Sequence, residues 1–162
     1  MLTLRADRIV MEFEIRPMKL NDIDRVYSIE LSSHRTPWSR EILHDCVLVG
    51  YDCRVLERTT VLMKQVIGYI ICRNNVNVCH ILNLCISSEQ QGKGYGKKLL
   101  LSVLDSLTNS STVVLEVRPS NKAALKLYKK LGFKKDLVKK NYYKDNSGEE
   151  DAILLKKIIL GN

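Results

Sequence analysis

The sequence lacks the features that mark several classes of protein. It has no apolar run long enough to cross a bilayer, and its first residues are too charged for a secretory signal peptide. Its five cysteines form no CxxC pair and only three histidines accompany them, which argues against a disulfide framework and against a metal site. A cytoplasmic protein without a metal, whose cysteines are small core residues, is therefore the expectation.

No linker, repeat or low-complexity block divides the chain. Its 162 residues, 45% hydrophobic and 27% charged, suit one globular domain with a sizeable core. The alternating pattern of apolar residues begins only after Met11. We therefore expect residues 1–10 to be a flexible extension and residues 11–162 to form a single domain.

The chain has few acidic residues for its number of basic ones, and its formal net charge is +8. Much of the excess comes from lysines between positions 122 and 140. Such a charge suggests an anionic partner, which could be a nucleic acid, a ribosome or a phosphorylated cofactor. No RNP-like aromatic motif accompanies the lysines, so a solvated basic face is favoured over direct binding of nucleic acid.

Hydrophobic periodicity predicts a chain of mixed secondary structure in the order β-α-α-β-β-β-α-β-α-β-β. Strands show alternating or continuous apolar patterns, whereas the helices show apolar residues at helical spacing. The expected strands lie within 12–16, 47–57, 61–73, 76–87 and 112–117, with two more around a turn at 144–150, and the helices within 21–33, 36–46, 95–107 and 120–132.

Three glycines, Gly92, Gly94 and Gly96, separate the strand that ends near Ile86 from the next helix. A strand, a glycine-rich turn and a helix together favour binding of a pyrophosphate at the helix N-terminus, with charge from nearby lysines. The P-loop spacing is absent, and the dinucleotide fingerprint would need a glycine at position 97. What remains is the pattern Q-x-x-G-x-G, which taken alone is also compatible with a flexible turn.

The pattern Q-x-x-G-x-G, in this order of elements, resembles the motif with which the GCN5-related N-acetyltransferases (GNAT) hold acetyl-coenzyme A. The segments "LEVRPSNKAALKLYKKLGF" (115–133), "NYYKDNSGEEDAILL" (141–155) and "TPWS" (36–39) resemble the bacterial RimI branch of that family. That branch acetylates the N-terminal alanine of a ribosomal protein. The resemblance extends from Met11 to about Lys157.

The resemblance implies an α/β (mixed α+β) fold, with a mostly antiparallel central sheet flanked by helices. The sheet would splay between the strand ending at Ile86 and the strand ending at Val117, which opens a slot for acetyl-coenzyme A. The cofactor-binding residues that it implies are Leu84, Cys85, Ile86, Gln91, Gly92, Lys93, Gly94, Tyr95, Gly96, Lys97 and Asn121.

The resemblance also implies two catalytic residues. Glu116 interrupts the apolar run "TVVLEV" and would be the general base, although a structural ion pair to Arg118 or a lysine explains it equally well by spacing alone. Tyr128 would donate a proton to the departing thiolate, although an aromatic residue at helical spacing is more often a core residue. Cys85 raises the alternative of a covalent acetyl-cysteine, but no histidine is identifiably placed to activate it.

The expected activity is transfer of an acetyl group to the N-terminal α-amine of a protein. Trp38, Tyr142 and Tyr143 are expected to line a groove for the extended end of that peptide. Each of these aromatic residues could equally belong to the core or the rim. The alternatives are an acetyltransferase for lysine or a small amine, and a non-catalytic module that binds acetyl-coenzyme A or RNA.

Overall fold

The computed structural model describes residues 11–108 and 110–161, so the expected extension at residues 1–10 lies outside the described residues. The order of strands and longer helices is the predicted one, with two short 3-10 turns added. The strands are β1 (Glu12–Pro17), β2 (Asp52–Thr59), β3 (Lys64–Asn75), β4 (Val78–Ile86), β5 (Ser111–Val117), β6 (Lys134–Asp145) and β7 (Gly148–Ile159). The helices are α1 (Ile23–Ser33), α2 (Arg40–Leu48), α3 (Tyr95–Ser106) and α4 (Lys122–Lys130), and the 3-10 turns are η1 (Leu20–Asp22) and η2 (Ser88–Gln90).

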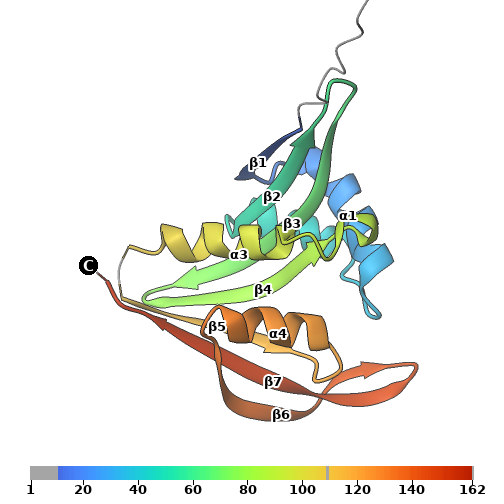
Figure 1. Ribbon diagram of the computed structural model, residues 1–162. Helices are drawn as coiled ribbons and strands as arrows, with labels where there is room; N and C mark the ends of the chain where they lie inside the picture. The colour runs from blue at the N-terminus through green and yellow to red at the C-terminus, as the bar shows by residue number, and fades with distance from the viewer. Residues whose placement is uncertain (1–10, 109, 162) are drawn as a thin grey trace, which may run out of the picture.

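The seven strands form one sheet in the order β1-β2-β3-β4-β5-β7-β6 (Figure 1). Neighbouring strands are antiparallel except β4 and β5, which are parallel. This mixed, mostly antiparallel sheet with flanking helices confirms the predicted fold class.

Helices cover both faces of the sheet. Side chains alternate between the two faces along each strand, so both faces carry apolar residues that pack against helices. On β3, Ile70 and Cys72 join a core cluster with residues of α3 and α4, whereas Tyr69 and Ile71 join a second cluster with residues of α1 and α2. All five cysteines are buried, as the sequence predicted.

The sheet opens between its two parallel strands. β4 and β5 pair only at three positions, the last of which joins His80 to Val114. The register of β3 with β4 shifts directly after this point, where Asn83 pairs with Ile71 and Ile81 with Cys72, so that Leu82 is an extra residue. A bulge of this kind bends a strand, and it accounts for the divergence of β4 from β5 that Figure 1 shows.

The predicted strands begin too early in three places. Val47 and Leu48 close helix α2, and Gly50, with a φ of 81°, follows its end. Leu62 is 91% exposed in a turn before β3, and Val76 is 88% exposed in the turn before β4. The helix predicted at 95–107 ends one residue earlier, because Leu107 follows α3 as its C-terminal cap. Apolar pattern alone did not distinguish these turn residues from strand or helix residues.

No helix in the described ranges is both long enough and apolar enough to cross a membrane.

Candidate active site

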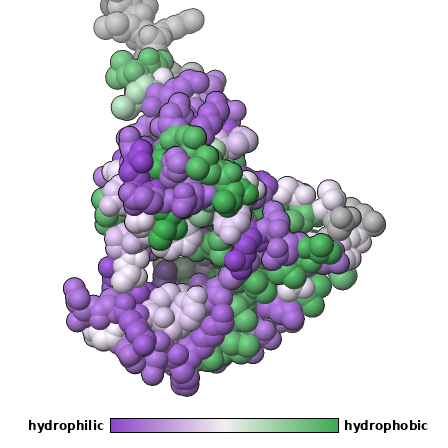
Figure 2. Space-filling model, turned by 180° about the vertical axis from the view of Figure 1, so that it is seen from behind, coloured by the Kyte–Doolittle hydropathy of each residue, from purple (hydrophilic) through white to green (hydrophobic). Residues whose placement is uncertain are grey.

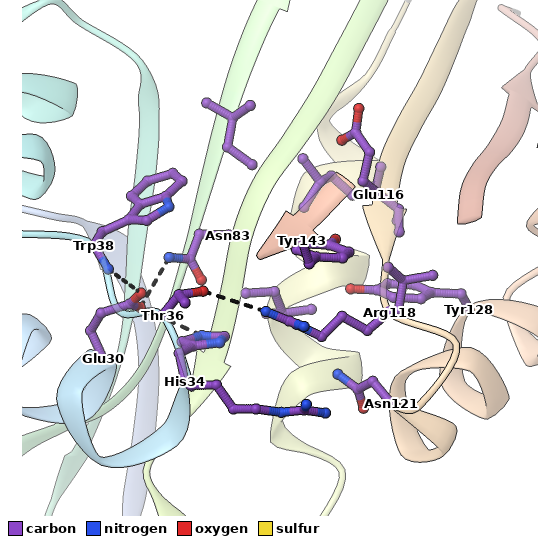
Figure 3. A pocket seen from close by; sticks show the side chains of 16 residues that line it. Glu30, His34, Thr36, Trp38, Asn83, Glu116, Arg118, Asn121, Tyr128 and Tyr143 are labelled. Atoms are coloured by element: carbon purple, nitrogen blue, oxygen red, sulfur yellow. Dashed lines mark hydrogen bonds and ion pairs between the residues drawn. The ribbon is translucent and has the colours of Figure 1, made fainter. Parts of the chain in front are cut away.

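A cavity of about 210 Å³ lies where β4 and β5 diverge. Figure 2 shows the molecule hollowed there, and Figure 3 shows that side chains enter the cavity from two opposite sides. One side is formed by α1, the loop after it and β4, and the other by β5, α4 and β6. The lining residues include Glu30, His34, Arg35, Thr36, Trp38, Asn83, Leu84, Glu116, Arg118, Asn121, Tyr128 and Tyr143.

Glu116 projects into this cavity from β5 and is held by two partners. Its Oε2 lies 2.7 Å from Nε2 of His80, and its Oε1 accepts a hydrogen bond of 2.8 Å from Nζ of Lys139. The hydrogen bond to His80, followed by that to Lys139, lowers the pKa of Glu116 to about 2 in spite of its burial. Glu116 is therefore an ion-paired carboxylate, and its cationic partner is a lysine rather than Arg118.

Tyr128 reaches the cavity from α4 and is almost fully buried. Its ring packs edge-on against Phe133, with 5.6 Å between the centroids. Burial raises its pKa well above the ordinary value of 10, so the phenol keeps its proton. Tyr128 is thus both a core residue and a lining residue, and the two interpretations of its spacing are compatible.

Glu30, on α1, forms a buried polar network at the opposite side of the cavity (Figure 3). Its carboxylate accepts hydrogen bonds from the backbone N–H of Trp38 at 2.9 Å and from Nδ2 of Asn83 at 3.0 Å. The hydroxyl of Tyr69 also donates to it, and Nε2 of His34 lies 3.5 Å away. These contacts tie the loop between α1 and α2 to β3 and β4.

Two arginines connect that loop to the other side of the cavity. Nη2 of Arg35 donates to the hydroxyl of Ser120 at 2.8 Å. Nη2 of Arg118 donates to Oγ1 of Thr36 in that loop at 3.5 Å, and its guanidinium lies 3.3 Å from Glu150. The loop at 34–39 and the β6–β7 hairpin therefore face each other across the cavity.

Two of the three aromatic residues that the sequence indicated line the cavity, one on each side. Trp38 is the first of them. Tyr142 is 50% exposed and is not among the lining residues, whereas its neighbour Tyr143 is. The ring of Tyr142 packs against Tyr143 with 5.0 Å between the centroids. The strand is irregular here, because the register of β6 with β7 shifts between Lys139 and Tyr143 and Asn141 has a φ of 50°. The sequence "NYY" could therefore not say which tyrosine faces inward.

The glycine turn has the backbone that an anion site requires. Gly92 and Gly94 have φ values of 76° and 84°, and the space where their side chains would lie is open. Gly94 is the N-cap of α3, and no side chain caps that helix. The first N–H groups of α3 therefore remain available to a phosphate, with the positive end of the helix dipole behind them.

Other residues of the predicted cofactor site have structural roles as well. Nε2 of Gln91 donates to the carbonyl of Ile86 at 2.9 Å and so shapes the turn. The ring of Tyr95 packs on Phe13, which leaves its backbone N–H as its contribution to the site. Asn121 lines the cavity and also caps α4, because its Oδ1 accepts from the N–H of Ala124 at 3.2 Å. Lys93 and Lys97 are exposed beside the glycines.

The slot fits a pyrophosphate that is followed by an extended chain of amides. Beyond His80, β4 pairs with β3 only, and beyond Val114, β5 pairs with β7 only. The facing edges of Leu84–Ile86 and of residues 115–117 therefore carry backbone groups that an added strand-like ligand can pair with. The open edge of β4 ends at the glycine turn.

Cys85 is not placed as a nucleophile. Burial raises the pKa of its thiol to about 11. Its Sγ approaches the carbonyl of Ile86, and no histidine among the described residues contacts it. An acetyl-cysteine route therefore has neither a thiolate nor a base at this position.

Sequence reasoning missed several residues of the site. Glu30, Asn83 and Arg118 line the cavity, and His80 contacts Glu116. A signal existed for Glu30, because it is an acidic residue at an apolar position of α1. No signal existed for His80, whose partner lies 36 residues away on another strand.

The family model and the relatives of known name that match this chain are all acetyltransferases. Residues 22–133 match the sequence model of the Acetyltransferase (GNAT) family. A [Ribosomal protein bS18]-alanine N-acetyltransferase of Haemophilus influenzae is 35% identical over 137 residues, which cover 83% of this chain and 90% of that protein. The protein of the same name in Haemophilus ducreyi is 33% identical over 141 residues, covering 86% and 94%.

A solved structure agrees with these relatives. The crystal structure of the ribosomal-protein-S18-alanine N-acetyltransferase from Escherichia coli is similar to this chain with a TM-score of 0.84 and 29% identity. The similarity covers 93% of this chain and 96% of that one.

Proposed function

The chain belongs to the acetyltransferase (GNAT) family, and from that premise we propose that it acetylates the N-terminal α-amine of a protein, namely the alanine that begins ribosomal protein bS18. The chain is an N-acetyltransferase, and acetyl-coenzyme A supplies the acetyl group as a thioester. The observation that carries the proposal is the cavity at the divergence of β4 and β5, which brings Glu116, Tyr128 and Trp38 together. A ribosomal substrate implies that the reaction takes place in the cytoplasm.

In this proposal, each part of the cofactor is held by a different element. The glycine turn and the first N–H groups of α3 hold the pyrophosphate, with Lys93 and Lys97 adding charge. The open edge of β4 at Leu84, Cys85 and Ile86 pairs with the amides of the cofactor. Backbone N–H groups at that edge also polarise the carbonyl that is attacked.

Glu116 binds the acceptor amine and receives its proton, directly or through one water. Because His80 and Lys139 keep its pKa at about 2, this carboxylate is a weak base. A weak base suits an α-amine, whose ordinary pKa is about 7.7 to 8.0, far better than a lysine, whose ordinary pKa is about 10.4. The electrostatics of Glu116 thus favour an N-terminal substrate.

Tyr128 donates its proton to the departing thiolate of coenzyme A. Its burial keeps the phenol protonated until the thiolate forms. Trp38 and Tyr143, on opposite sides of the cavity, would contact the first residues of the peptide. Tyr142 would contact the peptide only outside the cavity.

The deciding experiment is acetyl transfer to a peptide that begins with Ala and contains one internal lysine, followed by mass spectrometry. The same peptide with a blocked α-amine and, separately, ribosomal protein bS18 serve as the second and third substrates. We expect one acetyl group on the free peptide and on bS18, and none on the blocked peptide. Acetylation of the blocked peptide would instead establish a lysine acetyltransferase, and salt-sensitive RNA binding without any transfer would establish a binding module.

A further inference from the structure

His80 is the histidine that contacts the carboxylate of Glu116. It pairs with Val114 at the last position where β4 and β5 are joined, and Val114 and Glu116 project from the same face of β5. The 2.7 Å contact between Nε2 and Oε2 is therefore built into the sheet just before it opens. The side chains of His80 and Glu116 are only 20% and 12% exposed.

Arg73, on β3, contacts the other nitrogen of the His80 ring and so determines which nitrogen carries the proton. Its Nη2 lies 3.4 Å from Nδ1 of His80. A guanidinium can only donate, so Nδ1 must accept and the proton of the neutral ring must lie on Nε2. The three side chains thus form a directed series in which Arg73 donates to His80 and His80 donates to Glu116.

The two partners of Glu116 differ in how firmly they are held. His80 lies within the paired part of the sheet, between Arg73 and Glu116. Lys139 reaches Oε1 from β6 with a flexible side chain that is 39% exposed. It lies where the register of β6 and β7 shifts, between Lys139 and Tyr143. An incoming ammonium group can therefore replace Lys139 at the carboxylate, whereas His80 stays in place.

We propose that His80 is a positioning residue that holds Glu116 toward the acceptor amine. This inference rests on the proposed function. The His80 ring donates from Nε2 to Oε2, which leaves Oε1 to face the acceptor amine once that amine replaces Lys139. Arg73 on β3, Glu116 on β5 and Lys139 on β6 are the charged groups that act on this ring among the described residues.

The test compares His80→Gln with His80→Ala by measuring kcat and KM for the Ala peptide at pH 8. Gln keeps an N–H donor for Glu116, so His80→Gln should retain a kcat within about twofold of the wild type. Ala removes that donor, so His80→Ala should lower kcat about tenfold, while the KM for acetyl-coenzyme A stays unchanged.

His44→Gln, a change of a partly exposed histidine on α2, is the matched control and should keep the kcat of the wild type. An equal loss of kcat in His80→Gln and His80→Ala, or normal kcat in His80→Ala, would overturn the inference. Nitrogen NMR of the imidazole, recorded without peptide, gives a readout that does not depend on acetyl transfer. It should show the Nε2–H form, and the Nε2 signal should move in Glu116→Gln.

The Nδ1–H form, or an Nε2 signal that Glu116→Gln does not move, would contradict the inference. If the wild type fails to acetylate the Ala peptide, the proposed function is wrong, while these spectra still decide whether His80 is coupled to Glu116.

Discussion

Tyr128 can be tested by removal of its hydroxyl group alone. In Tyr128→Phe the ring remains against Phe133, and the change removes no hydrogen bond to another described residue. We expect kcat to fall about a hundredfold, because the thiolate loses its proton donor, while the Kd for acetyl-coenzyme A stays unchanged. Steady-state kinetics and calorimetric titration measure the two quantities. Equal turnover in the variant would remove Tyr128 from the mechanism.

Glu116 also couples folding to pH. Its pKa in the folded protein, about 2, lies below the ordinary value of 4.5, so its hydrogen bond with His80 and its ion pair with Lys139 stabilise the fold above pH 4.5. That contribution is lost as the pH falls from 4.5 towards 2, because the unfolded chain binds the proton more readily. Urea unfolding at several pH values should therefore show a smaller loss of stability over this range in Glu116→Gln than in the wild type.

The control for this pH dependence is Glu14→Gln, at an exposed position of β1 with no ion pair to another described residue. It should leave the acid dependence of the wild type unchanged. An equal loss in the wild type and in Glu116→Gln would show that the ion pairs of Glu116 are not coupled to folding.

At the scale of elements, the effect of backbone strain at the glycine turn can be measured separately from its effect on the binding of acetyl-coenzyme A. Gly94, at the start of α3, and Gly50, after α2, have nearly equal φ values of 84° and 81°, and both have open space around them. Alanine at either position should cost about 1 kcal/mol of stability, because the left-handed backbone disfavours a side chain. Only Gly94→Ala should also weaken binding of acetyl-coenzyme A, since only Gly94 lies beside the proposed phosphate site. Equal affinities in the two variants would contradict the assignment of the turn.

The loop between α1 and α2 depends on the buried carboxylate of Glu30. In Glu30→Gln an NH2 group takes the place of one carboxylate oxygen. This NH2 group would face the donors of Trp38, Asn83 and Tyr69, and one or more of them would lose its acceptor. We expect a loss of about 2 kcal/mol in the free energy of unfolding. The KM for the peptide should also rise, because the loop that carries Trp38 is less firmly held. Urea unfolding and peptide kinetics test both, with Glu14→Gln as the control that removes a charge without a network.

At the scale of the whole molecule, the core protects the thiols. All five cysteines are free and buried. Burial raises the pKa of Cys53 to about 12 and that of Cys85 to about 11. A thiol reagent such as Ellman's reagent should therefore react slowly or not at all with the native protein at pH 8, and with all five thiols after unfolding in guanidinium chloride. Rapid reaction of a thiol in the native protein would show that the core opens.

The family motifs could be read from the sequence because they are local. Gln91 to Gly96 span one turn and the start of α3, and Asn121, Ala124 and Tyr128 lie on α4 and its N-cap, so their spacing alone brings them together. The same holds for most strands and helices, whose apolar periodicity reports which face is buried. The ends of these elements were less certain, because a turn such as that at Val61 and Leu62 can be as apolar as a strand.

Only the tertiary structure decided what surrounds the catalytic residues. It assigned Lys139 and His80 to Glu116, gave Arg118 to Glu150, and turned Tyr143 rather than Tyr142 into the cavity. These contacts join strands far apart in the chain, and a single bulge at Leu82 sets where β4 leaves β5. Register shifts of one residue change which side chains face each other, and sequence periodicity does not report them. The sequence alone therefore determined the family, the order of elements and the residues of the motifs, whereas the packing of the sheet determined the electrostatics of the site.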